Sequence, residues 1–304
     1  MSYYRALGLE KEPFSTSPDP GFFYSSAGHR SALCRLQIAV ALKRGMSVMV
    51  GDIGTGKTTV SRKLSQALSE DDNVVFRMIL NPYFRTEKQF LSRLAAVFHI
   101  PLPKGNLTAL DYMESIERYL FAQGVENGKT VVLLIDESQI LPDFVFEVLR
   151  ILLNYETNEF KILQLVLVGQ MELLPRITGM ANFWDRVSAK VMLKPLESGE
   201  VRELIESRLR YAGYKRDEPM FTPEAIELIC RKTNGYPRRV SLFCHNVLEH
   251  MVMHGSRRVD LQLVNRVIDK EIEMDDFRGL VAATVQVEEG FGESPSGMLR
   301  VVGA

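Results

Sequence analysis

Residues 51–58 read Gly51-Asp52-Ile53-Gly54-Thr55-Gly56-Lys57-Thr58 and match the pattern G-x-x-x-x-G-K-[ST] at every position. An apolar run at residues 46–50 precedes them, and residues 58–68 have the spacing of an amphipathic helix. Glycines let the backbone wrap closely around an anion, and the N–H groups of such a loop and of the following helix then face that anion. The segment therefore predicts a phosphate-binding loop between a strand and a helix.

Within this loop the side chains have separate expected roles. Lys57 is long enough to reach the β- and γ-phosphates of a nucleotide, and the Thr58 hydroxyl can ligate Mg²⁺. The alternative is a flexible glycine turn with a chance lysine, which the flanking strand and helix disfavour. The expected nucleotide-binding residues of this region are Gly51, Asp52, Ile53, Gly54, Thr55, Gly56, Lys57, Thr58 and Thr59.

A second motif follows about eighty residues later. Residues 131–135 are five apolar residues, and Asp136 and Glu137 come directly after them. Two acids at the end of a buried strand lie beside the phosphate loop if the two strands are neighbours. Asp136 would then hold Mg²⁺ through water, and Glu137 would orient or deprotonate the attacking water. A strand often ends in an exposed acid, so the motif is weak alone and gains strength from the upstream loop.

Short apolar runs alternate with helical patterns along the first two thirds of the chain. Continuous apolar strands separated by helices are typical of a parallel sheet covered on both faces. The expected strands are residues 46–50, 74–80, 131–135, 162–168 and 187–193. Amphipathic helical patterns then follow at residues 200–212, 223–233, 239–254 and 261–274. We expect an α/β domain with a five-stranded parallel sheet flanked by helices, followed by a small all-α domain.

These patterns divide the chain into four expected parts. Residues 1–45 form an N-terminal arm and a first helix that pack on the core, and residues 46–195 form the core itself. Residues 196–275 form the helical domain. Residues 276–304 mix Gly, Ser, Pro and Glu with a few valines, so we expect a flexible tail.

The composition excludes several classes of protein. The 304 residues carry 37 Lys+Arg and 38 Asp+Glu, a net charge of −1, which removes the simplest case for nucleic-acid binding, a globally basic domain. The three cysteines, Cys34, Cys230 and Cys244, form no C-x-x-C pair, so neither a disulfide framework nor a zinc site is expected. The sequence has no signal segment and no run of about 18 apolar residues, which favours a cytoplasmic protein without a membrane span.

Two further polar residues have an expected role at the same site. Gln170 follows the apolar run 162–168, where an amide can sense the γ-phosphate or position water. A solvated glutamine at a strand end is an alternative that the sequence leaves open. Arg238, in Gly235-Tyr236-Pro237-Arg238-Arg239, can fold over a nucleotide from the helical domain. An exposed arginine in a turn between helices is the alternative.

Several segments together resemble a known family. They are Tyr4-Arg5-Ala6-Leu7-Gly8-Leu9, Pro13-Phe14-Ser15, Ser17-Pro18-Asp19-Pro20, Phe23-Tyr24 and His29-Arg30-Ser31-Ala32-Leu33, together with the loop, the acidic pair and the Arg238 segment. The chain resembles an AAA+ ATPase, most specifically the ExeA/GspA-like bacterial ATPases of secretion and surface-assembly systems, with the MuB/TnsC transposition ATPases as relatives. The resemblance covers about residues 3–270 and implies a P-loop NTPase fold of the ASCE/AAA+ class, with the helical domain as a lid.

The resemblance also implies roles for individual residues. Gln170 looks like sensor 1, and Arg238 looks like the sensor 2 arginine of the lid. Arg186 looks like the arginine finger that reaches the nucleotide of a neighbouring subunit, although Asp185 stands where the family usually has glutamine. Arg176 is a competing candidate for the finger. Secretion-type members can continue into a membrane span and a peptidoglycan-binding domain, which this sequence lacks, so an envelope role is expected to act through a partner.

The expected function is Mg²⁺-dependent hydrolysis of ATP, with Glu137, Lys57, Gln170 and Arg186 as the catalytic residues. The finger implies a homo-oligomer, either a ring or a filament. The resemblance implies a protein partner in a secretion, pilus or polysaccharide-export system. The alternative is an ATP-dependent, DNA-binding transposition regulator of the MuB/TnsC type, for which double-stranded DNA is the ligand and the arginine-rich helical domain the binding surface.

Overall fold

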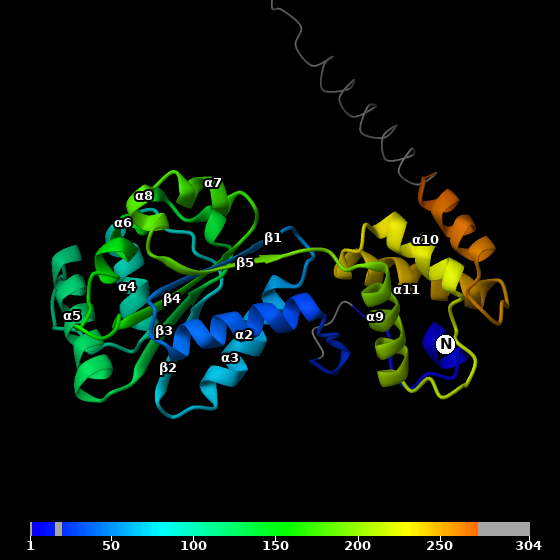
Figure 1. Ribbon diagram of the computed structural model, residues 1–304, viewed down its shortest axis with the longest axis horizontal. Coiled ribbons are helices and arrows are strands. Elements are labelled where there is room, and N and C mark those ends of the chain that lie inside the picture. Colours follow the sequence, from blue (N-terminus) through cyan, green and yellow to red (C-terminus); the bar gives the residue numbers. More distant parts are fainter. Residues whose placement is uncertain (1, 16–19, 273–304) are drawn as a thin grey trace, which may run out of the picture.

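The computed structural model describes residues 2–15 and 20–272. Figure 1 shows a sheet covered by helices and, beside it, a smaller group of helices. The strands are β1 (Met46–Gly51), β2 (Val74–Ile79), β3 (Thr130–Ile135), β4 (Leu163–Gly169) and β5 (Val187–Leu193). They are all parallel and lie in the order β2-β3-β4-β1-β5. The five-stranded parallel sheet predicted from the apolar runs is therefore confirmed.

The strand order separates the phosphate loop from the acidic pair by one strand. β4 lies between β1 and β3, with Val50 paired with Gly169 and Ile135 paired with Leu167. β1 and β3 are thus not neighbours, and Gln170, which follows β4, comes between the two motifs. All three motifs still share one edge of the sheet, because the carboxyl ends of parallel strands meet there.

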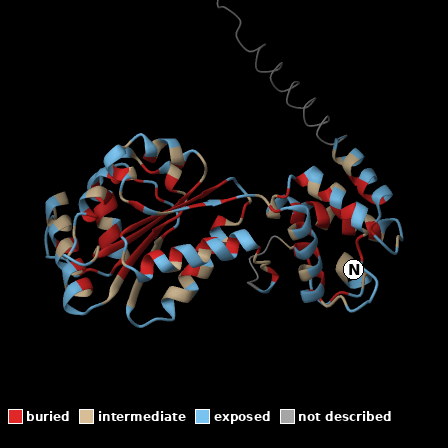
Figure 2. Cartoon of the chain, viewed as in Figure 1, coloured by how far each residue is buried: buried red, intermediate tan, exposed pale blue. Residues whose placement is uncertain are grey.

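Helices cover both faces of this sheet. They are α2 (Ala27–Ala41), α3 (Lys57–Ser69), α4 (Glu87–Val97), α5 (Ala109–Phe121), η2 (Ala122–Glu126), η3 (Ser138–Ile140), α6 (Asp143–Leu152), α7 (Leu173–Thr178) and α8 (Ala181–Trp184). Helices α2 and α3 pack on one face, and α4, α5 and α6 pack on the other. Val131 and Leu133 enter the second layer and Val132 the first. Residues 131–135 of β3 are therefore all apolar, because both faces of the strand are buried there. Figure 2 shows these buried strands between half-exposed helices.

The helical part contains α9 (Ser198–Tyr211), α10 (Pro223–Thr233), α11 (Pro237–Met253) and a further helix at residues 261–272. Its helix starts have clear local causes. The Thr222 side chain accepts a hydrogen bond from the Ala225 N–H, and Pro223 takes the first helical position of α10, where its missing N–H is not needed. Pro237 begins α11 in the same way.

The N-terminal arm, with α1 (Tyr3–Ala6) and η1 (Pro20–Phe22), packs on the helical part. Leu9, Phe14 and Phe22 are buried in one apolar cluster with residues of α9, α10 and α11, and Figure 1 shows the N-terminus there. The prediction that residues 1–45 pack on the sheet core is therefore wrong for the arm, because the apolar faces of these helices receive its aromatic side chains. The following helix, α2, packs on the sheet.

Some predictions fall on residues outside the described ranges. The tail at 276–304 and most of the turn at 17–20 are among them. Within residues 2–15 and 20–272, no helix combines the length and the apolar character that a bilayer span requires.

Candidate nucleotide site

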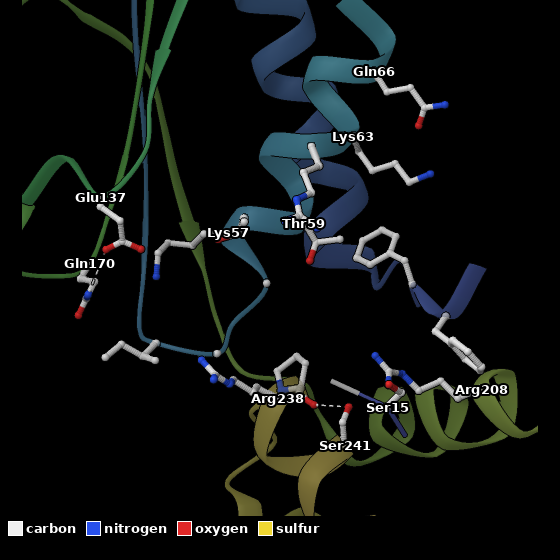
Figure 3. Close-up of a pocket in the computed structure, with 18 residues that line it drawn as sticks. Ser15, Lys57, Thr59, Lys63, Gln66, Glu137, Gln170, Arg208, Arg238 and Ser241 are labelled. Carbon is white, nitrogen blue, oxygen red and sulfur yellow. Dashed lines mark hydrogen bonds between the residues drawn. The ribbon is translucent and has the colours of Figure 1, made fainter. Parts of the chain in front are cut away.

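A cavity of about 520 Å³ lies between the sheet part and the helical part. Its wall is formed by the phosphate loop, α3, the residues after β3 and β4, the arm, and helices α9 and α11. Figure 3 shows Glu137 and Gln170 at one end of this cavity and Ser15 and Arg208 at the other. The first end thus carries a carboxylate and an amide. The second end is basic, and the Phe22 ring lies there, 6.0 Å from the guanidinium carbon of Arg208.

The loop between β1 and α3 is held in an open curve. Gly54 and Gly56 have φ angles of +87° and +98°, which glycine adopts without steric penalty. The Thr55 hydroxyl donates to Asp52 O at 2.8 Å. From α2, His29 Nε2 donates to Thr55 O at 2.8 Å, so the first helix braces the loop from behind.

Lys57 lies in the middle of this curve. Its Nζ donates to Gly51 O at 2.8 Å and to Asp52 O at 3.0 Å. Burial lowers the pKa of Lys57, and the negative charges of Glu137 and Asp136 partly oppose that effect. The ammonium group is therefore a desolvated cation, which is a strong partner for a phosphate oxygen. The two carboxylates near it would repel a bound anion unless a metal cation lay between them.

The two acids after β3 have different environments. Asp136 is 3% exposed, and burial raises the pKa of its carboxyl, whereas hydrogen bonds with the Glu137 N–H and the Thr58 side chain lower it. The structure thus joins Thr58 and Asp136, the two predicted metal ligands. Glu137 is more accessible and faces the cavity.

The Glu137 carboxylate is held by two glutamines. Gln139 Nε2 donates to Glu137 Oε2 at 2.6 Å, and Gln170 Nε2 donates to the same oxygen at 3.4 Å. Gln139 Oε1 also accepts from the Gln170 N–H at 3.0 Å. A side chain at Gly169 would crowd this amide, because a Cβ there would lie 3.0 Å from Gln139 Oε1. Gln139 therefore connects the acid after β3 to the end of β4.

The helical part contacts the loop directly. The Tyr236 hydroxyl donates to Asp52 Oδ2 at 2.8 Å, and the Arg238 N–H donates to Gly54 O at 3.4 Å. Figure 3 shows the Arg238 side chain beneath the loop, at the cavity wall. The segment from 235 to 239 thus lies against the phosphate loop, although the side chains of Arg238 and Arg239 are exposed.

Most of the predicted site residues converge here. Those in the cavity wall are Ile53, Gly54, Gly56, Lys57, Thr58, Thr59, Glu137, Gln170 and Arg238. Gly51 and Thr55 are buried behind the wall, and Asp52 faces Tyr236.

Arg186 does not reach this cavity. It precedes β5, whose Val187 pairs with Met46 at the start of β1, so it lies at the sheet edge opposite the phosphate loop. Its guanidinium donates to Arg150 O at 3.1 Å and to Asn154 Oδ1 at 2.6 Å.

The competing arginine is connected to the site through a neighbour. Arg176 Nη1 donates to Gln139 O at 2.7 Å, and its guanidinium pairs with Asp143. It therefore touches the backbone of the residue that holds Glu137, without itself lining the cavity.

Gln139 and Arg208 were not among the nucleotide-site residues predicted from the sequence. Gln139 lies two residues after Glu137, and this proximity was a usable signal. Arg208 is on α9, about 150 residues from the loop in sequence. Its helical spacing from Leu204 and Ile205 puts it on the apolar face of α9, unlike the exposed Arg202 and Arg210, and this spacing was a usable signal.

Comparisons with known proteins agree with this geometry. The family described as "AAA domain" matches residues 41–177, which include the phosphate loop, the acidic pair and Gln170. General secretion pathway protein A of Aeromonas hydrophila is 33% identical over 298 residues, covering 95% of this chain and 53% of that protein. Residues 41–177 of the chain are an AAA domain. The resemblance of this AAA+ chain to the ExeA/GspA-like ATPases is thus confirmed, and the chain spans about half the length of that relative.

Solved structures show the same AAA+ fold. Cdc6p from Pyrobaculum aerophilum superimposes with a TM-score of 0.64 at 16% identity, over 86% of this chain and 72% of that chain. The Drosophila ORC structure bound to DNA gives a TM-score of 0.61 at 19% identity, over 89% of this chain and 66% of that chain. An uncharacterized HTH-type transcriptional regulator of Methanocaldococcus jannaschii is 24% identical, over 86% of this chain and 73% of that protein.

Proposed function

We propose that this AAA+ ATPase binds Mg²⁺ and ATP in the cavity and hydrolyses the ATP, acting in the cytoplasm to drive or regulate assembly of a bacterial envelope complex. The single observation that carries the nucleotide chemistry is the convergence of Lys57, Asp136 and Glu137 at one sheet edge, beside the glycine loop. Similarity to general secretion pathway protein A supports the envelope role. The complex would be a secretion, pilus or polysaccharide-export system.

Phosphate binding rests on the loop and Lys57. Two backbone carbonyls accept from Lys57 Nζ, and phosphate oxygens are stronger partners for an ammonium group because they carry full negative charge. The helix α3 begins at Lys57, so its free N–H groups and its dipole face the same point. The β- and γ-phosphates would lie there, with the terminal phosphate toward Glu137.

Thr58 and Asp136 fit a magnesium ion. Both offer hard oxygen ligands, and they are close enough together for the Thr58 side chain to lower the pKa of Asp136. Mg²⁺ usually takes only one or two protein ligands, together with water and substrate phosphates. In the part of the chain that the structure describes, no group of three His, Cys, Asp or Glu forms a larger metal cage. When bound, the ion would neutralise charge that develops on the phosphates.

Glu137 is the proposed general base. The two glutamines hold its Oε2, which leaves Oε1 to accept a proton from, or orient, a water molecule beside the terminal phosphate. Gln170 would contact that water or phosphate from β4, and Arg238 would add positive charge from the helical part. These three residues come from three separate elements, so the site is complete only when sheet and helical part lie together.

The remaining positive charge is proposed to come from a second copy of this chain. Arg186 lies at the edge of the sheet opposite its own loop, so it would serve the nucleotide of a neighbour in a ring or filament. Transition states of phosphoryl transfer gain strongly from such a charge. Turnover per subunit should then fall on dilution to monomers, and constant specific activity down to the monomeric range would refute the oligomeric site.

The basic test measures ATP binding and ATP turnover for the wild-type chain and two variants. Lys57→Ala is expected to lose most ATP affinity, because it removes the cation of the phosphate site. Glu137→Gln is expected to retain ATP affinity and lose turnover by roughly 100-fold or more. Unchanged ATP affinity in Lys57→Ala would refute the assignment of the phosphate site.

DNA-dependent regulation is the alternative function. Its support is the likeness to a protein described as an HTH-type transcriptional regulator and the fold shared with an ORC structure bound to DNA. Anisotropy titrations of labelled double-stranded DNA, with ATP at two salt concentrations, separate the two functions. Tight binding that weakens steeply with salt and stimulates ATP turnover would favour the DNA role. Co-purification with envelope components, without such binding, would favour the assembly role.

A further inference from the structure

Arg208 is a cation of the cavity wall that the proposed hydrolysis does not use. It lies on α9, and its side chain points into the cavity at the end opposite Glu137 (Figure 3). The phosphate loop and Lys57 lie between these two ends. Arg208 is therefore separated from the position where the terminal phosphate would be bound.

The guanidinium of Arg208 has unused hydrogen-bonding capacity. Its Nε and Nη1 atoms are buried and have no hydrogen-bond partner among the described residues. The carboxylate in the described cavity wall is Glu137, at the other end. The Phe22 ring lies 6.0 Å from the guanidinium carbon, and the fully buried Cys244 is close by, which leaves the cation in poorly solvating surroundings.

Such an arrangement is unfavourable unless a ligand completes it. A buried donor without a partner loses its hydration and gains no compensating bond, and a buried charge loses more. Burial lowers the pKa of Arg208, but an arginine starts so high that it stays charged at neutral pH. The fold thus maintains a positive charge with free donors at the edge of a cavity.

The neighbouring side chains indicate the kind of ligand. Phe22 lies beside Arg208, and Phe22 and Phe23 both line the cavity. Aromatic rings offer a surface on which a planar heterocycle can pack. A nucleotide whose phosphates follow the loop would extend its base toward this end. Bases carry ring nitrogens and carbonyl oxygens that accept hydrogen bonds from arginine.

We propose that Arg208 binds the base of the nucleotide by donating hydrogen bonds to acceptor atoms on the edge of the base. Helix α9 would then contact the nucleoside, while the loop binds the phosphates. The inference rests on the proposed nucleotide site. Arg208 would make binding depend on the base. It would also give the helical part a second contact with the nucleotide, besides Arg238.

The test compares ATP with inorganic tripolyphosphate as calorimetric titrants, each with Mg²⁺, for the wild-type chain and for Arg208→Met. The wild type is expected to bind ATP more tightly than tripolyphosphate. The variant should bind ATP about tenfold more weakly, the loss of a hydrogen bond to a charged group, and bind tripolyphosphate as before. Arg210→Met, an exposed arginine on the same helix, is the matched control and should change neither affinity.

Two results would overturn the proposal. One is an equal loss for ATP and tripolyphosphate in Arg208→Met, which would place Arg208 among the phosphate contacts or in the fold. The other is a tenfold loss with ATP that disappears with 2′,3′-dideoxy-ATP, which would assign the contact to the ribose. A wild-type chain that binds neither titrant would instead refute the nucleotide site itself, so the two failures are distinguishable.

Thermal unfolding gives a readout that a structural role would not produce. Because Nε and Nη1 of Arg208 are buried without a hydrogen-bond partner among the described residues, Arg208→Met is expected to unfold without nucleotide at the wild-type temperature or above it. Its stabilisation by added ATP should be smaller than that of the wild type. A lower unfolding temperature without nucleotide, combined with full stabilisation by ATP, would contradict the proposal. Arg208→Lys, which retains the charge, is the second variant should Arg208→Met fail to fold.

Discussion

Glu137 has a backbone φ of +53°, in the left-handed region that non-glycine residues seldom adopt. The chain leaves β3 sharply at this residue. The Ser138 hydroxyl donates to Ile135 O at 2.8 Å, and the Glu137 N–H donates to Asp136 Oδ1 at 2.9 Å. Hydrogen bonds on both sides therefore hold a strained residue in place, and the strain directs its carboxylate toward the cavity.

Gln139 is expected to act on turnover through its contact with Glu137. In Gln139→Leu the carboxylate loses a 2.6 Å hydrogen bond and the Gln170 N–H loses its acceptor. The turnover number should fall about tenfold, the effect of one hydrogen bond to a charged group, while ATP affinity stays within about twofold. Steady-state kinetics together with equilibrium binding separates these quantities. An equal loss of affinity would mean that Gln139 supports the loop and not the base.

The buried Asp136 makes stability depend on pH with a defined sign. Burial raises the pKa of its carboxyl in the folded chain, so the ionised acid lowers the free energy of unfolding, most strongly above the folded-state pKa. Asp136→Asn removes the buried charge and should therefore raise the free energy of unfolding at neutral pH. The gain should shrink as pH falls toward about 3.9, the ordinary pKa of aspartate. Urea unfolding without nucleotide, at a series of pH values, measures it.

Asp111 provides a control of opposite sign. It caps α5, and hydrogen bonds from Thr108 lower the pKa of its carboxyl. A lowered pKa contributes stability above the ordinary pKa of aspartate, and this contribution is lost as pH falls through the folded-state value. Asp111→Asn should therefore decrease stability at neutral pH. If both variants changed stability in the same direction, the assignment of the Asp136 effect to burial would be wrong.

At the scale of elements, α2 and the phosphate loop form one unit. His29 lies in the first turn of α2, is 5% exposed, and donates to Thr55 O. Because this bond fixes the loop before any phosphate contact is made, less ordering is required when an anion binds. Helix α2 thus holds the phosphate loop in position, although it contributes no residue to the cavity wall.

Gly56→Ala tests the contact between α2 and the loop. A Cβ at this position would lie 2.5 Å from His29 Nε2, at a φ of +98°, so loop and helix must separate. We expect ATP affinity to fall tenfold or more, in line with about 1–3 kcal/mol of backbone strain. Gly128→Ala is the matched control, since Gly128 also has a positive φ but has nothing within 4 Å of its Cβ position. Equal effects of the two substitutions would refute the role of the His29 contact.

At the scale of the whole molecule, the chain has separate apolar cores in the sheet part and in the helical part. The cavity lies between the two parts. Contacts that cross between them include the Tyr236 hydroxyl to Asp52 and the Arg238 N–H to Gly54 O. The arm also crosses, since Phe22 is buried in the helical core while Ala27 begins α2 on the sheet. A ligand in the cavity would therefore touch both parts at once.

Mixing two inactive variants tests whether sites are shared between copies. Arg186→Ala and Glu137→Gln should each lose most turnover, the first by removing the proposed finger and the second by removing the base. When they are mixed, an intact Arg186 can serve an intact Glu137 of a neighbour, and roughly one quarter of wild-type turnover should return. The same mixture made with Arg176→Ala tests the competing arginine. No recovery in either mixture would place both arginines outside a shared site.

Local sequence was sufficient for the elements and for most of the site. The runs at 46–50, 131–135 and 162–168 are apolar at nearly every position because both faces of these strands are buried, and that pattern is visible without coordinates. The phosphate loop is equally local, since its function needs consecutive backbone amides and a neighbouring lysine. Asp136 and Glu137 were predicted for the same reason, because they come directly after the apolar run at 131–135.

Long-range packing decided the remainder. The insertion of β4 between β1 and β3, the burial of Phe14 in the helical core, and the position of Arg208 at the cavity each join segments far apart in the chain. A short stretch of sequence does not specify these contacts. An apolar face or a long cationic side chain can pack against several different elements, and the positions of the other elements decide which one it meets. Periodicity identifies a helix or a strand, whereas only the packed fold selects its neighbour.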